Sequence, residues 1–71
     1  MAILESDLQN RFTYHPPKND QALRYEMIRD RAHGFAAFLN EKCPDSREKS
    51  LALTHLEDAV MWANAAIARN E

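Results

Sequence analysis

Cysteine and glycine are nearly absent from this chain of 71 residues, which contains one of each, Cys43 and Gly34. A single cysteine excludes an intrachain disulfide, and a single glycine excludes a glycine-rich phosphate loop. The three histidines are too far apart to complete a metal-binding motif, so we expect no metal and no cofactor. A chain of this length buries too little surface to be stable without reinforcement, which leaves association with further copies of itself.

Long apolar runs and an excess of positive charge are also missing. The longest uncharged segment, residues 59–68, is far shorter than the roughly 20 residues that cross a membrane, and no segment has the pattern of a secretory signal. The free thiol favours a reducing compartment, so we expect a soluble cytoplasmic protein. The net charge of −2 disfavours duplex DNA or RNA as a partner but permits a small phosphorylated ligand.

Catalytic combinations of residues are not found either. Ser46 and Ser50 have no neighbouring base placed to activate them, and Cys43 lies beside a proline without a histidine to activate its thiol. Acidic pairs such as Glu5 and Asp7 are typical of solvated helix faces. We therefore predict a protein that binds and does not catalyse.

Apolar residues recur with helical spacing along most of the chain and predict an all-α fold. Leu4, Leu8 and Phe12 predict a short helix over residues 3–12. Two apolar seams predict two long helices, over residues 20–42 and 46–69. The first seam consists of Tyr25, Ile28, Ala32, Phe35 and Leu39, and the second of Leu53, Leu56, Val60, Ala63 and Ile67.

The connection between the two long helices is only a few residues long. Pro44 ends the first helix, and Asp45 with Glu48 reads as a capping box that starts the second, with Ser46 as the alternative cap. Such a short connection forces an antiparallel pair. Gly34, inside the first long helix, costs roughly 1 kcal/mol relative to alanine, which suggests a close backbone approach or a slight kink there.

The second long helix is apolar nearly all round. Its second apolar set, outside the seam, consists of Ala52, Ala59, Met61, Trp62 and Ala66. One helical partner cannot cover both sets, so other subunits must cover the rest. The chain is thus predicted to form a single helical-hairpin domain, residues 1–71, that assembles as a homo-oligomer.

The segment between the short helix and the first long helix is stiff and extended. Pro16 and Pro17 fix their own φ angles and push His15 into an extended conformation. This segment reads either as a structural elbow or as a rigid arm that presents Tyr14 for stacking on a nucleobase, worth about 1–3 kcal/mol per base. In the second interpretation His15 and Lys18 lie near phosphate. Asn19 or Asp20 then caps the following helix.

Three further groups have both a structural and a functional interpretation. Arg24, Arg29 and Arg31 near the start of the first long helix form a solvated, salt-bridged face or bind phosphate through paired hydrogen bonds. Residues 46–50 cap the second long helix or bind an anion at its positive end. Asn64, in an apolar stretch, sets the register of an oligomer or, less favoured, contacts a ligand.

Two segments resemble a known family. They are residues 12–18, Phe-Thr-Tyr-His-Pro-Pro-Lys, followed by Asp-Gln at 20–21 and Arg-Tyr-Glu at 24–26, and residues 43–54 together with Ala-Val-Met-Trp-Ala-Asn-Ala at 59–65. These segments resemble the phage anti-CBASS cyclic-oligonucleotide sponges, whose helical-hairpin domain is shared with a class of anti-Thoeris proteins. The resemblance covers about residues 12–70.

The resemblance implies a compact homohexamer in the cytoplasm of an infected bacterium. It would bind and sequester cyclic oligonucleotide second messengers, such as cGAMP, without cleaving them, and so block activation of the CBASS effector. The implied cyclic dinucleotide site, between paired protomers, consists of Tyr14, His15, Pro16, Lys18 and Arg29. The candidates for a cyclic trinucleotide site, where three protomers meet, are Arg47, Ser50, Asn64 and Arg69. The alternative is a structural or adaptor bundle that binds a host protein.

Overall fold

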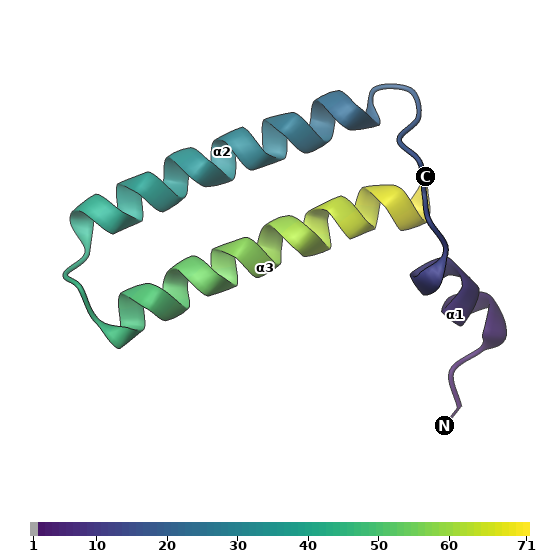
Figure 1. The fold of residues 1–71 in the computed structure, drawn as a ribbon, viewed down its shortest axis with the longest axis horizontal. Coiled ribbons are helices and arrows are strands. Elements are labelled where there is room, and N and C mark those ends of the chain that lie inside the picture. The colour runs from purple at the N-terminus through teal and green to yellow at the C-terminus, as the bar shows by residue number, and fades with distance from the viewer. Residues whose placement is uncertain (1) are drawn as a thin grey trace.

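The computed structural model describes residues 2–71, which form three helices and no strand (Figure 1). α1 spans Glu5–Phe12, α2 spans Gln21–Lys42 and α3 spans Arg47–Asn70. α2 and α3 lie side by side and antiparallel, and α1 lies beyond the C-terminal end of α3 (Figure 1). The predicted all-α helical hairpin is confirmed, with α1 beginning at Glu5 where the pattern placed its start at residue 3.

The turn between α2 and α3 is capped by Ser46. Its backbone is extended and its Oγ accepts a hydrogen bond of 3.1 Å from the backbone N–H of Lys49. The preferred prediction of Asp45 as the cap is therefore wrong, and the alternative is confirmed. The Asp45 carboxylate instead binds the Lys49 Nζ at 2.5 Å, and the same ammonium donates to the backbone oxygen of Asn40 at the end of α2. Lys49 thus ties both helix ends to the turn.

The start of α2 lacks the predicted side-chain cap. Asp20 occupies the cap position, but its side chain makes no capping hydrogen bond. Asn19 adopts a φ of 54°, a left-handed conformation that asparagine tolerates better than most residues. The tight turn is closed by the backbone N–H of Gln21, which donates to the backbone oxygen of Lys18 at 3.0 Å.

α2 and α3 pack along a seam of half-buried side chains. Its apolar members are Tyr25, Ile28, Ala32, Ala36 and Leu39 from α2 and Leu53, Leu56, Val60, Ala63 and Ile67 from α3. Phe35, predicted to lie in the seam, is 53% exposed and Ala36 lies there instead. A straight helix repeats every 3.6 residues and drifts away from a 3.5-residue pattern, which explains the shift. The predicted close approach at Gly34 is not made within this chain, because an added Cβ would meet nothing within 4 Å.

The isolated hairpin leaves most of its apolar surface uncovered. Among residues 2–71 no hydrophobic side chain is fully buried, and Phe38 and Trp62 are 53% and 67% exposed. The accessible surface is 5895 Å², against about 4500 Å² for a compact monomer of this mass. The radius of gyration is 15.6 Å, against about 11 Å expected for this length. None of the helices described is long and apolar enough to cross a membrane.

The cap assignment predicts different costs for two neighbouring substitutions. Ser46→Ala should lower the free energy of unfolding by about 1 kcal/mol, because a backbone N–H at the start of α3 loses its acceptor. Asp45→Ala, which removes an exposed ion pair, should have a smaller effect. Urea denaturation at one fixed protein concentration measures both. A larger loss for Asp45→Ala would contradict the assignment.

Candidate ligand-binding site

The linker between α1 and α2 crosses the open end of the hairpin, past the C-terminal end of α3 (Figure 1). Its first half is held by two hydrogen bonds. The Nδ2 of Asn10 donates to the backbone oxygen of Arg69 at 3.3 Å, and the Nε2 of His15 lies 2.8 Å from the backbone oxygen of Asn10. Because a carbonyl oxygen only accepts, Nε2 of His15 carries the proton in this contact. Tyr14 therefore follows a segment that is tied to α3.

The second half of the linker is held by Gln21, which is 3% exposed and the one buried residue among residues 2–71. Its Oε1 accepts a hydrogen bond of 3.1 Å from the backbone N–H of Lys18, and its Nε2 donates to Oε1 of Glu71 at 3.2 Å. The Nζ of Lys18 also donates to the backbone oxygen of Glu71 at 2.7 Å. The linker, α2 and the end of α3 therefore meet at one amide side chain.

Arg24 and Glu71 form the ion pair next to this amide. Nη1 of Arg24 donates to Oε2 of Glu71 at 2.9 Å, and Nη2 donates to Oε1, so the contact is bidentate. Asp20 lies 3.2 Å from Nε of Arg24 as a second ion-pair partner, in a geometry that is not that of a hydrogen bond. The hydrogen bonds from Arg24 and then from Gln21 lower the pKa of Glu71 to about 2. The hydrogen bond to Glu71 likewise raises the pKa of Arg24.

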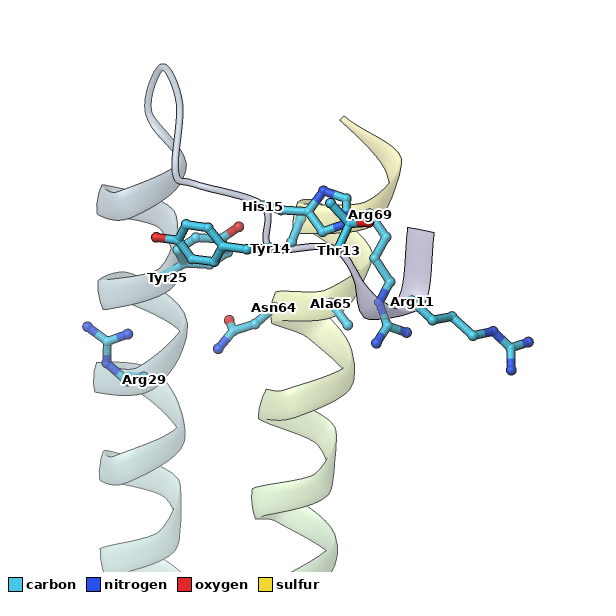
Figure 2. Close-up of a pocket in the computed structure, with 10 residues that line it drawn as sticks. Arg11, Thr13, Tyr14, His15, Tyr25, Arg29, Asn64, Ala65 and Arg69 are labelled. Atoms are coloured by element: carbon cyan, nitrogen blue, oxygen red, sulfur yellow. The ribbon is translucent and has the colours of Figure 1, made fainter. Parts of the chain in front are cut away.

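A groove of 410 Å³ lies below the linker, between α2 and α3 (Figure 2). This volume is in the range of small-molecule sites. Its lining combines aromatic rings, cations and small side chains: Arg11, Thr13, Tyr14, His15, Tyr25, Arg29, Asn64, Ala65, Ala68 and Arg69. The structure thus brings Tyr14, His15 and Arg29, which were predicted together from the sequence, into one groove.

The groove is positively charged although the whole chain has a net charge of −2. Arg11, Arg29 and Arg69 come from α1, α2 and α3 respectively, and no carboxylate lines the groove. Within the described chain, residues 2–71, no carboxylate forms an ion pair with Arg29. Figure 2 shows the Arg11 guanidinium pointing away from the hairpin. Arg29 therefore has a guanidinium available for an anionic ligand, unlike Arg24, which already binds Glu71.

Asn64 supplies an unsatisfied acceptor in the same groove. Its Oδ1 is buried and has no hydrogen-bond partner, and Figure 2 shows its side chain pointing from α3 toward α2. An unpaired buried acceptor costs about 1–3 kcal/mol, so a donor from outside this chain would relieve a real penalty.

The four residues predicted for a trinucleotide site do not meet within one chain. Asn64 and Arg69 line the groove described above, whereas Arg47 and Ser50 lie at the other end of α3. Ser50 and Arg69 are about 28 Å apart along the helix axis at 1.5 Å per residue. Such a site would need residues from different copies of the chain.

Pro16 and Lys18 line an adjoining hollow of 370 Å³ on the other side of Tyr14 and His15. Glu71 also lines it, and its backbone oxygen already binds the Lys18 ammonium.

The interpretation of residues 46–50 as an anion site is weakened in a similar way, because Ser46 caps α3 and Lys49 binds Asp45 and Asn40.

Several residues of this region were missed by sequence reasoning. Tyr25 was assigned only to the seam, and Arg11 was given no role. Gln21 and Glu71 had no visible signal, because the contacts of Glu71 with Lys18, Gln21 and Arg24 span 47 to 53 positions in the sequence. A polar residue at the first position of a helix ordinarily reads as solvent-exposed.

The sequence profile of the Acb2/Tad1 hairpin-domain family matches residues 5–68. Because the match spans most of the chain, the protein belongs to this family, which is that of the anti-CBASS and anti-Thoeris sponges. The family resemblance found in the sequence is thereby confirmed. No curated protein and no solved structure gives a significant match. The matched segment includes Tyr14, Arg29 and Asn64, whereas Arg69 and Glu71 follow it.

The lowered pKa of Glu71 predicts how acid affects the fold. A carboxylate with a folded pKa of about 2 and an ordinary value of 4.5 stabilises the protein fully above pH 4.5. Its contribution is lost as the pH falls toward 2. Glu71→Gln should therefore reduce the pH dependence of stability between pH 5 and 2, measured by urea denaturation. A carboxyl titration by NMR that places the pKa of Glu71 above 4 would contradict this contact.

Proposed function

We propose that this protein binds and sequesters cyclic oligonucleotide second messengers, cyclic dinucleotides such as cGAMP first, without cleaving them. In the cytoplasm of an infected bacterium it would thereby keep the CBASS effector inactive. The observation that carries the proposal is the groove itself. It combines two tyrosines with Arg29, whose guanidinium has no carboxylate partner among residues 2–71, and no carboxylate lines it, in a member of the sponge family.

The chemistry of a cyclic dinucleotide matches this lining. The ligand has two negative phosphates and two bases with exposed π-faces. Tyr14 is 77% exposed on a proline-stiffened arm, so its ring is available to stack on a base. The Arg29 guanidinium can donate two parallel hydrogen bonds to a phosphate. An arm already held in place loses less conformational entropy on binding, which favours affinity.

Sequestration without cleavage is supported by the residues at the groove. Hydrolysis of a phosphodiester needs a general base or an activated nucleophile beside the phosphorus. The lining has no carboxylate, cysteine or serine, and its hydroxyls, on Thr13, Tyr14 and Tyr25, make no hydrogen bond to a base among residues 2–71. His15 is the one conventional base, and its ring is hydrogen-bonded through Nε2 to the backbone oxygen of Asn10 and not to any of these hydroxyls.

We propose further that the functional form is a homohexamer. The chain exposes about 1400 Å² more than a compact monomer of its mass, which exceeds the roughly 800 Å² that each partner buries in a standard protein interface, so one chain has surface for more than one such contact. A pair of identical chains suits a nearly twofold ligand, because each half can be read by the same residues. In this arrangement Tyr14 and Arg29 of each chain contribute to one ligand. Cyclic trinucleotides would bind where three chains bring Arg47 and Ser50 near Asn64 and Arg69.

Titration calorimetry with a panel of cyclic di- and trinucleotides tests the binding. Arg29→Ala and Tyr14→Ala should each weaken cyclic dinucleotide binding more than tenfold, because a phosphate contact or a stacked ring is lost. Tyr14→Phe keeps the ring and should bind nearly as well as the wild type. Lys42→Ala, at the far end of α2, is the control for loss of a positive charge.

The bound nucleotide should be recovered intact after the complex is denatured. Absence of any binding below micromolar concentration would sink the sponge proposal and favour the adaptor alternative, in which the exposed apolar face binds a host protein. Recovery of a linear product would replace it with a hydrolytic function. Equal affinity for the wild type, Arg29→Ala and Tyr14→Ala would place the ligand elsewhere.

Sedimentation tests the assembly. The wild type should sediment as six copies of the 8.2 kDa chain, about 49 kDa. Trp62→Glu should dissociate it, because a charge replaces a large exposed aromatic on the uncovered face of α3. Thr54→Glu, a charge on another exposed position of α3, is the comparison. A wild type that sediments as a single chain would contradict the hexamer.

A further inference from the structure

We propose that Gln21 and Glu71 are positioning residues for ligand binding. Together with Lys18 and Arg24 they form a cluster, here called the linker clamp, that holds the Tyr14–His15 arm over the groove. Loosening the clamp should weaken binding although none of the clamp side chains lines the groove. This inference rests on the proposed function of the groove.

Burial singles out Gln21. Glutamine is mostly exposed in folded proteins, yet Gln21 is 3% exposed in a chain whose described residues include no fully buried hydrophobic side chain. Its amide is used at both ends, with Oε1 accepting from Lys18 and Nε2 donating to Glu71. A buried amide with both ends satisfied specifies one arrangement, because any shift of the linker or of α3 leaves a buried polar group unpaired.

The arm depends on such anchors because Tyr14 is 77% exposed and its own packing does not fix it. On one side of the arm, His15 is held through Asn10 to the backbone of Arg69. On the other side, the backbone of Lys18 is held by Gln21. Pro16 and Pro17 lie between these two anchors and stiffen the segment, since their φ angles are fixed. Release of the second anchor frees one end of the segment that carries Tyr14 and His15.

The ion pair between Arg24 and Glu71 holds the helix ends that bound the groove. Arg24 lies five positions before Arg29 on α2, and Glu71 follows α3 directly. Their bidentate contact joins the start of α2 to the end of α3, next to the Gln21 amide. The Arg24 guanidinium is thus already paired with Glu71. Arg29, further along the same helix, forms no ion pair with a carboxylate among residues 2–71.

The sign of one effect separates positioning from simple electrostatics. Glu71 is a negative charge in the hollow that adjoins the groove, and the ligand carries two negative charges. If Glu71 acted only through its charge, removing it would tighten binding. If Glu71 positions the arm, removing it weakens binding. The two roles therefore predict opposite changes in affinity.

The test uses Glu71→Ala, Glu71→Gln and Gln21→Leu in the full chain. Hydrogen exchange of the Lys18 amide, which donates to Gln21, is measured without ligand, and affinity for 3′,3′-cyclic GMP-AMP is measured by calorimetry. Glu71→Ala should speed exchange of this amide at least tenfold and weaken binding at least fivefold, with sedimentation unchanged. Glu71→Gln keeps the shape and should show a smaller effect of the same sign. Glu57→Ala, which removes a charge from exposed α3 surface, should change neither.

Unchanged exchange in Glu71→Ala, or binding that is as tight as or tighter than the wild type, would overturn the inference while leaving the proposed function intact. If the wild type itself binds no cyclic nucleotide, the proposed function fails and this inference fails with it. If Gln21→Leu does not fold, the two Glu71 variants alone test the inference, because substitution at this exposed position leaves the seam between α2 and α3 untouched.

Discussion

Two helices joined by a short turn can cover only one face of each other, and the rest of this molecule follows from that limit. The seam between α2 and α3 is half-buried along its length, and no hydrophobic residue from 2 to 71 is fully enclosed. Side chains such as Phe38 and Trp62 stay exposed on the single chain, and the proposed oligomer would cover them. The same limit leaves the end of the hairpin open, and the linker that closes this end creates the groove.

Polar contacts hold this open end together where apolar packing does not. The one buried residue there is Gln21, and around it Lys18, Arg24 and Glu71 complete a hydrogen-bonded cluster. The arginines of this region also differ in their partners. Arg24 is neutralised by Glu71, whereas Arg29 faces a groove without carboxylates. The structural Arg24 and the proposed ligand-binding Arg29 therefore occupy the same helix within a few residues of each other.

Much of the fold could be predicted because helical spacing and a short connection are local signals. The predicted cap of α3 was wrong because the local sequence favours Asp45 and Ser46 almost equally at that position. Tyr14, His15 and Arg29 were predicted together, and the structure places them in one groove. Asn64 joins that groove instead of meeting Arg47 and Ser50. The clamp could not be predicted, because its contacts with Glu71 span 47 to 53 positions and no periodicity reports them.

The central claim is that the groove under the linker is where a cyclic nucleotide binds. A crystal structure of the protein with a bound cyclic dinucleotide tests it most directly. We expect the ligand between paired chains, with a base against the Tyr14 ring, a phosphate at the Arg29 guanidinium and the linker clamp unchanged. A ligand bound elsewhere on the surface, or crystals that take up no ligand at saturating concentration, would contradict the account.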